Sequence, residues 1–254
     1  MKETIFYPVG DSAAIGAAAR WLTNNGYSVV NSPNKHVTHL LLPVPSFESP
    51  GIIKGGQELR PLLEQLSPDI TICGGMLGNT DLSQFHSIDL LQDPTYIAAN
   101  AAITAECTLG IILHNLPRTI CNSEILINGW GRIGKHLAKQ LRALGSRVTV
   151  TARKETDRAM LQSLGYPAIA PIELDTSLLK YHVICNTAPQ QVLTPEQAGY
   201  CHSDCLKIDL ASVRGIPGED VIWARGLPGK CVPESSGELI AQTVLRLCSK
   251  EETI

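Results

Sequence analysis

The chain has 254 residues, 44% of them hydrophobic, and a formal net charge of −3. This length is enough to bury the core of one large domain or of two small ones. The sequence has no run of like charges, no signal-peptide pattern and no apolar stretch of about 18 residues, so we expect no nucleic-acid partner, no export and no membrane span.

The first half of the chain, residues 1–92, alternates short apolar runs with helical patterns, which is typical of a parallel sheet with helical crossovers. An Ala-rich helix, capped by Asp11 or Ser12, is predicted after the first strand and ends near Gly26. Four strands are predicted, at residues 4–9, 27–30, 39–45 and 69–75.

A long helix is predicted next, because apolar residues from Ile97 to Ile112 recur at helical spacing until Pro117. Further strands follow, at residues 124–128, 147–151, 181–186 and 205–211. The last helix carries a possible capping box, Ser235-x-x-Glu238. We therefore divide the chain into a first domain at 1–92, a second domain at 93–235 and a C-terminal helix at 236–254 that returns to the first domain.

The glycines Gly129, Gly131 and Gly134 form a G-x-G-x-x-G motif directly after a predicted strand and at the start of an amphipathic helix. In dinucleotide-binding folds the first glycine permits a tight turn, the second admits the pyrophosphate, and the third permits close helix–strand packing. The helix N-terminus offers free N–H groups to the phosphates. The motif in this context predicts a dinucleotide site.

The acidic residue that normally follows the second strand of such a fold is absent, and Arg153 and Lys154 stand in its place. A carboxylate there binds the ribose hydroxyls of NAD, whereas a guanidinium holds a 2′-phosphate with paired hydrogen bonds. This difference favours NADP as the cofactor. The alternative is that both residues are solvated side chains at the start of a helix.

Further short motifs stand where strand ends meet the cofactor: Asn186–Pro189 (NTAP), Asp209–Ser212 (DLAS) and Gly226–Gly229 (GLPG). Together with Leu42–Pro45 (LPVP), Asn100–Glu106 (NAAITAE) and the glycine motif, their order resembles the family of the A-type subunit of dipicolinate synthase, from endospore-forming bacteria. The chain departs from the family in the short stretch at 219–226, in Arg225 and in the PESSGEL sequence at 233–239.

The resemblance implies a cytoplasmic, NADP-linked oxidoreductase with a Rossmann domain and an N-terminal flavodoxin-like α/β domain. It implies oxidation of a dihydrodipicolinate-type dicarboxylate to dipicolinate during sporulation, together with a second, flavoprotein-like synthase subunit. We also expect a homo-oligomer. The residues expected at the cofactor are Gly129, Gly131, Arg132, Ile133, Gly134, Arg153, Lys154, Asn186, Thr187, Ala188, Pro189, Asp209 and Ala211.

Candidate catalytic residues follow from the chemistry of such a substrate. Ser212, Arg214 and Lys230 are expected on loops after strand ends, where they would bind carboxylates, although each is also compatible with a polar surface loop. Glu106 is a candidate proton acceptor and Thr104 its neighbour on the long helix, although an interdomain hydrogen bond explains them equally well. The histidine pattern identifies no general base.

Two other functions remain open. A 2-hydroxyacid or alanine-type dehydrogenase has the same two-domain plan but needs a histidine that is not evident after DLAS. A non-catalytic NADP-binding protein is the second alternative. The eight cysteines include no CxxC pair and are interpreted as free thiols in a reducing cytoplasm. Cys201, His202 and Cys205 lack a second ligand pair, so no metal is expected.

Overall fold

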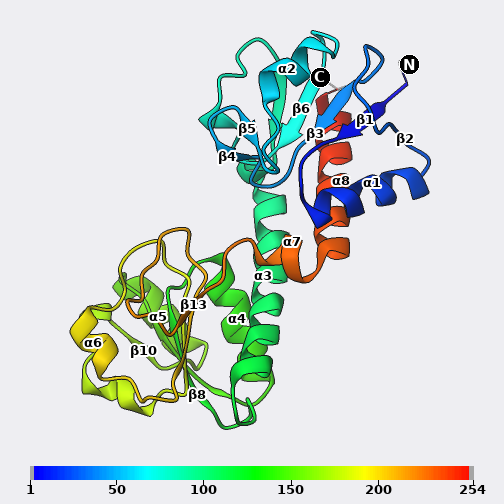
Figure 1. Ribbon diagram of the computed structural model, residues 1–254. Helices are drawn as coiled ribbons and strands as arrows, with labels where there is room; N and C mark the ends of the chain where they lie inside the picture. Colours follow the sequence, from blue (N-terminus) through cyan, green and yellow to red (C-terminus); the bar gives the residue numbers. More distant parts are fainter. Residues whose placement is uncertain (1–2, 252–254) are drawn as a thin grey trace. The chain divides into compact units, whose positions relative to one another are not determined.

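The computed structural model describes residues 3–251, which form two compact units. The first unit takes the described residues up to Ile103 together with those from Pro228 onward, and the second unit is Thr104–Leu227. Each unit is built on its own parallel sheet (Figure 1). The predicted α/β class and two-domain plan are confirmed.

The sheet of the first unit has five parallel strands in the spatial order β2-β1-β3-β6-β7. Numbered within the sheet, this order is 2-1-3-4-5, one of the two common orders of doubly wound sheets. Its strands are β1 (Ile5–Pro8), β2 (Ser28–Val29), β3 (His39–Leu41), β6 (Thr71–Gly74) and β7 (His86–Asp89). An antiparallel pair, β4 (Phe47–Ser49) and β5 (Ile52–Ile53), lies in the connection from β3 to β6.

Two apolar clusters form in this unit because successive side chains of a strand point to opposite faces. Phe6 and Leu41 belong to the cluster that includes residues of α1 and α8, whereas Tyr7 and Leu40 belong to the cluster that includes α2. Besides the start of α3 (Pro94–Asn115), the α-helices with residues in this unit are α1 (Ala13–Asn24), α2 (Leu59–Glu64), α7 (Leu227–Cys231) and α8 (Pro233–Glu251).

Helices α1 and α8 lie side by side (Figure 1), and Gly237 permits their close approach. A Cβ atom on Gly237 would lie 2.5 Å from the backbone nitrogen of Ala18 and 2.6 Å from the backbone oxygen of Ala14. The predicted capping box in this region is wrong. Helix α8 begins at Pro233, which is pre-organised for a first helical position, so Ser235 and Glu238 lie inside the helix.

The second unit has a six-stranded parallel sheet in the order β10-β9-β8-β11-β12-β13. Numbered within the sheet, this is the order 3-2-1-4-5-6 of the Rossmann fold. The strands are β8 (Glu124–Asn128), β9 (Arg147–Thr151), β10 (Ala168–Ile169), β11 (Val183–Asn186), β12 (Leu206–Asp209) and β13 (Val221–Trp223). The helices α4 (Arg132–Ala143), α5 (Glu155–Ser163) and α6 (Pro195–Gly199) connect them.

The long helix α3 (Pro94–Asn115) begins in the first unit and ends in the second. The sequence division at residue 92 therefore precedes the structural boundary at Ile103, because the start of α3 packs with the first unit, where Tyr96 is buried in the same cluster as Phe6. By length and composition alone α3 is apolar enough to cross a membrane, as core helices also are, and 39% of the tested window is buried.

Candidate functional site

The glycine loop of the second unit turns sharply at the end of β8. Gly129 has φ +106°, a conformation that side chains other than glycine rarely adopt. A Cβ on Gly134 would overlap the carbonyl oxygen of Gly129, whereas a Cβ on Gly131 would meet no atom within 4 Å. The loop is therefore packed on its protein side and open on its outer side, as a phosphate-binding loop must be.

Helix α4 begins at the open side of this loop. Its N-cap residue is Gly131, which has no side chain to accept from the first N–H groups of the helix. Its first turn contains Arg132 and no acidic residue. These N–H groups and the positive end of the helix dipole are thus available to an anion.

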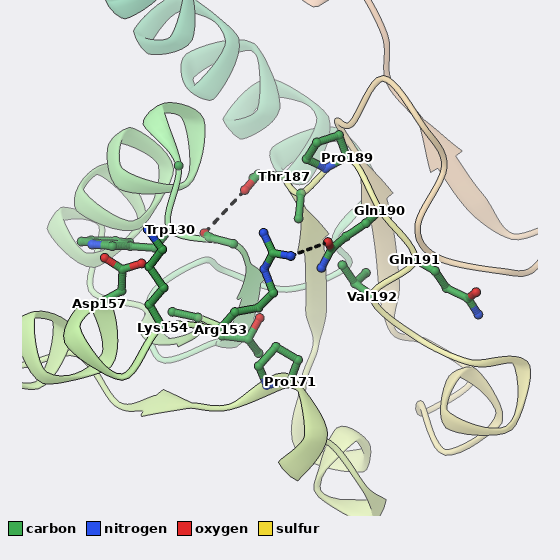
Figure 2. Close-up of a pocket in the computed structure, with 15 residues that line it drawn as sticks. Trp130, Arg153, Lys154, Asp157, Pro171, Thr187, Pro189, Gln190, Gln191 and Val192 are labelled. Carbon is green, nitrogen blue, oxygen red and sulfur yellow. Dashed lines mark hydrogen bonds between the residues drawn. The ribbon is translucent and has the colours of Figure 1, made fainter.

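A pocket of about 300 Å³ opens beside the loop (Figure 2). It is lined by Gly129, Trp130, Gly131, Thr151, Ala152, Arg153, Lys154, Asp157, Pro171, Thr187, Ala188, Pro189, Gln190, Gln191 and Val192. Seven of the predicted cofactor residues are in this lining, namely Gly129, Gly131, Arg153, Lys154, Thr187, Ala188 and Pro189. Three more, Arg132, Ile133 and Gly134, form the first turn of α4 behind the loop.

The ends of three adjacent strands are joined beneath the pocket. The Thr151 hydroxyl at the end of β9 donates to Asn128 Oδ1 over 2.9 Å. Thr187, after β11, donates to the Asn128 carbonyl from its backbone N–H over 2.9 Å and from its hydroxyl over 3.0 Å. The buried Asn128 Nδ2 has no hydrogen-bond partner among the described residues. The pocket floor is thereby fixed before any ligand binds.

Arg153 extends across the pocket from the end of β9. Its Nη1 donates to Gln190 Oε1, on the opposite wall, over 3.0 Å (Figure 2). Arg158 braces the loop behind it by donating to the backbone carbonyls of Ala152 and Arg153, over 2.8 and 2.7 Å. Lys154 is exposed and Asp157 is the one carboxylate in the lining. The wall that faces a ribose in Rossmann folds therefore carries two cations and one anion.

Asp209 and Asn186 occupy a different position from the one predicted. Asp209 is fully buried outside the pocket lining, and it accepts from the Asn186 amide, over 3.0 Å, and from the backbone N–H groups of Ala211, Gly215 and Ile216. Its carboxylate oxygens are thus engaged within the protein. We assign Asp209, Asn186 and Ala211 to holding the loop after β12 rather than to contacting a cofactor.

The five predicted catalytic residues are not gathered in the pocket. Ser212 and Arg214 are exposed on the loop after β12, and Arg214 donates to the Gly218 carbonyl. Lys230 lies on α7 and belongs to the first unit. Thr104 is buried and Glu106 exposed on α3. Their roles stay predictions.

Several lining residues were not identified from the sequence. Trp130 stands inside the glycine motif itself, Thr151 ends β9 and Ala152 follows it, so the motif could have indicated all three. Pro171, Gln190 and Gln191 come from loops whose closeness to the motif only the tertiary fold creates. Among the described residues no group of three His, Cys, Asp or Glu side chains is placed to hold a metal ion.

Comparisons with known proteins find one curated relative and several solved structures with a similar fold. The sequence matches no protein-family profile. It is 27% identical over 159 residues to the A-type subunit of dipicolinate synthase from Bacillus subtilis (strain 168), and the match covers 59% of this chain. The same match spans 54% of that protein, about half of its length.

Two solved structures share the fold over nearly the whole chain. One is the A-type subunit of dipicolinate synthase from Bacillus halodurans, with a TM-score of 0.84, 22% identity, and coverage of 97% of this chain and 98% of that one. The other is a transhydrogenase from Sinorhizobium meliloti, with a TM-score of 0.73, 13% identity, and coverage of 97% and 94%.

Proposed function

We propose that this chain, a member of the family of the A-type subunit of dipicolinate synthase, is an NADP-dependent oxidoreductase. The observation that carries the proposal is the glycine loop with its open side at Gly131 and the uncapped start of α4. A pyrophosphate fits this loop because free N–H groups and a positive helix end face a space that no side chain fills. A bound nicotinamide dinucleotide would supply hydride acceptance and donation at this site.

The preference for NADP rests on the wall formed by Arg153 and Lys154. No carboxylate follows β9 directly, so no group there accepts from both ribose hydroxyls as NAD-specific sites require. Arg153 would bind a 2′-phosphate with paired charged hydrogen bonds, which are stronger than those between neutral groups. To do so it exchanges or shares its present bond with Gln190. Asp157 limits the net positive charge of this wall.

We further propose that the substrate is a dihydrodipicolinate-type dicarboxylate that is oxidised to dipicolinate during sporulation. The reaction removes a hydride and a proton from the ring, and aromatisation provides driving force. Ser212, Arg214 and Lys230 would bind the two carboxylates, and Glu106, with Thr104 beside it, would accept the proton. A homo-oligomeric assembly, a cytoplasmic location and a second, flavoprotein-like synthase subunit complete the proposal. These assignments rest on the family resemblance and on polar side chains at the strand ends and on α3.

A non-catalytic NADP-binding role is the second candidate. It is favoured because none of the five catalytic candidates lines the pocket beside the glycine loop. A 2-hydroxyacid or alanine-type dehydrogenase has less support, because the described loop after β12 provides no histidine.

The test is an assay of the purified full chain with a dihydrodipicolinate and NADP⁺, following the absorbance of the reduced nicotinamide. We expect reduction of NADP⁺ that depends on the dicarboxylate, and a raised KM for Arg214→Met compared with Arg118→Met as control. Cofactor binding without turnover in the presence of any dihydropyridine dicarboxylate would instead support the non-catalytic role.

A further inference from the structure

Two cysteines lie close together in the second unit, on the segment that links α6 to β12. Cys205 is buried and Cys201 is half-buried, and both belong to the same apolar cluster as Ile184 of β11. The two are four positions apart, and a turn lies between them in which the Cys205 N–H donates to the His202 carbonyl over 3.0 Å. The pair is therefore arranged by the fold and does not depend on any bound group.

The two thiols differ in their protonation. The neighbouring Cys205 side chain is the main cause that lowers the pKa of Cys201, to about 7, because its polar S–H group favours the thiolate. The positive charge of Lys207 lowers it further, against partial burial and the charge of Asp220. The same contact and burial raise the pKa of Cys205. Near pH 7 a substantial fraction of Cys201 is thus thiolate, while its neighbour Cys205 stays a protonated thiol.

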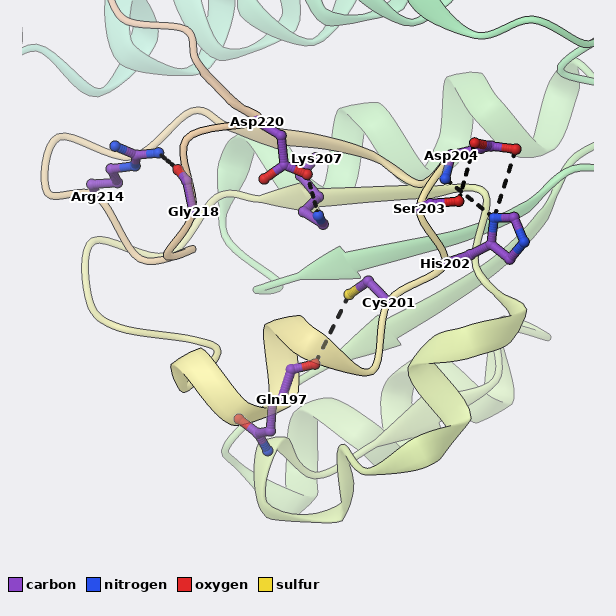
Figure 3. A network of polar contacts seen from close by, with 9 residues as sticks. All are labelled: Gln197, Cys201, His202, Ser203, Asp204, Lys207, Arg214, Gly218 and Asp220. Carbon is purple, nitrogen blue, oxygen red and sulfur yellow. Dashed lines mark hydrogen bonds and ion pairs between the residues drawn. The ribbon is translucent and has the colours of Figure 1, made fainter.

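Figure 3 shows Cys201 together with the charged side chains of this region. Lys207 is buried on β12, and its Nζ lies 2.5 Å from Asp220 Oδ2. The Cys201 thiol, when protonated, donates to the Gln197 carbonyl of α6 over 4.0 Å. His202 and Asp204 are exposed and form their own pair over 3.8 Å. Lys207 is therefore held in an ion pair on the strand that follows the two cysteines.

We propose that Cys201 and Cys205 form a redox-modification site, in which a peroxide converts the pair to an intramolecular disulfide. The Cys201 thiolate attacks one oxygen of the peroxide, the O–O bond breaks, and Cys201 becomes a sulfenic acid while hydroxide leaves. The Cys205 sulfur then attacks the sulfenic sulfur, its proton leaves with the hydroxyl as water, and the S–S bond forms. The two thiols lose two electrons and the peroxide gains them.

The other cysteines of the unit provide internal comparisons. Cys185 is fully buried, and burial raises its pKa to about 12, so it is protected both sterically and by protonation. Cys121 is exposed and serves as the matched control for general oxidation. The cluster that holds the thiol pair also contacts Val192, which lines the cofactor pocket. The disulfide itself does not require the proposed function, so the two are tested separately.

The experiment treats the reduced full chain with dilute hydrogen peroxide at pH 7, blocks the remaining thiols by alkylation and digests the protein with trypsin. The peptide from Tyr181 to Lys207 contains Cys185, Cys201 and Cys205. We expect this peptide to lose two hydrogen atoms and to carry a single alkyl group, on Cys185. Dithiothreitol restores the three-alkyl form. Cys205→Ser is expected to accumulate a sulfenic acid that dimedone traps at Cys201, and Cys121→Ser to behave as wild type.

The proposal is overturned if Cys121 is oxidised while Cys201 and Cys205 of the wild-type chain keep their alkyl groups. It is equally overturned if the oxidised product is a dimer linked through Cys201. Both outcomes are read from the wild-type chain, so they do not depend on whether a variant folds. A rise in the alkylation rate of Cys201 through pH 7, in the reduced chain, checks the thiolate on which the first step depends.

Discussion

The two units contain the same strand–glycine–helix connection, yet only in the second unit does the start of the helix face open space. In each sheet the first strand of the unit is followed by a glycine with a similar positive φ, +104° at Gly10 and +106° at Gly129, and then by a helix of 12 residues. Both glycines are packed on their protein side, and a Cβ on Gly129 would lie 2.7 Å from Thr187 Oγ1. A Cβ on Gly10 would lie 2.6 Å from Pro43 and 2.9 Å from the Lys54 carbonyl.

The start of α1 is covered, because the Asp11 N–H donates to the Lys54 carbonyl over 2.9 Å. Lys54 follows the β4–β5 hairpin, an insertion that the second sheet lacks within the residues described. At the corresponding place in the second unit Gly131 faces open space. A strand, a glycine turn and a helix therefore do not make a binding site by themselves. What fills the space above the turn decides whether a ligand enters.

The largest effect is expected from filling the packed side of the glycine loop. Gly134→Val places side-chain atoms against the Gly129 carbonyl, which displaces the loop and abolishes cofactor binding, with a loss of stability of about 1–3 kcal/mol. Calorimetric titration and chemical unfolding measure the two effects. Gly131→Ala is the control, since its Cβ enters open space and leaves stability unchanged while reducing affinity.

Asp209→Ala is expected to destabilise the second unit by about 3 kcal/mol, since it leaves several buried N–H groups without an acceptor. Urea unfolding measures the loss. Asp204→Ala, at an exposed carboxylate just before β12, is the control. If Asp209 contacted the cofactor instead, the variant would lose affinity without losing stability.

Gly237→Ala, in the first unit, tests whether that unit contributes to cofactor binding or only to stability. The new Cβ would collide with the backbone of α1 and lower stability by about 1–3 kcal/mol. NADP affinity, measured at a temperature where the variant is folded, should stay at the wild-type value because the pocket lies within the second unit. A parallel loss of affinity would mean that the first unit forms part of the cofactor site.

The smallest effect is expected at Gln190. Gln190→Ala removes the acceptor that holds Arg153 and, because this bond competes with a 2′-phosphate, should change NADP affinity by only a few-fold, about 1 kcal/mol. Gln191→Ala, on the adjacent lining residue, is the matched control. A loss comparable to that of an Arg153 variant would show that Gln190 binds the cofactor directly.

The second sheet was more predictable than the first because its signals are local. Strands β8 and β9 have the predicted bounds, and the glycine motif has the predicted turn. The β4–β5 hairpin and the strands β7, β10 and β13 were missed, since strands of two to four residues carry little periodicity. The bond between Arg153 and Gln190, 37 positions apart, depends on tertiary packing alone.

The contrast between local signals and tertiary packing also explains why Asp209 was predicted to contact the cofactor and instead bonds within the protein. From the sequence, an aspartate at a strand end is a ligand candidate, and only the burial of its side chain and its hydrogen bonds to the following loop show that it is engaged internally. Likewise the helix α8 begins at Pro233 and not at the capping box, because proline at the first helical position was the stronger start signal.

Whether Arg153 gives the site a preference for NADP is tested most directly by calorimetric titration of the full chain with NADP⁺ and with NAD⁺. The titrations compare the wild type, Arg153→Ala and Arg147→Ala. Arg147 begins the strand that Arg153 follows and is exposed, so it controls for the loss of one positive charge. We expect preferential binding of NADP⁺ that falls about 10- to 100-fold in Arg153→Ala alone, with NAD⁺ affinity unchanged. Equal affinity for the two cofactors, unaffected by either substitution, would contradict this expectation.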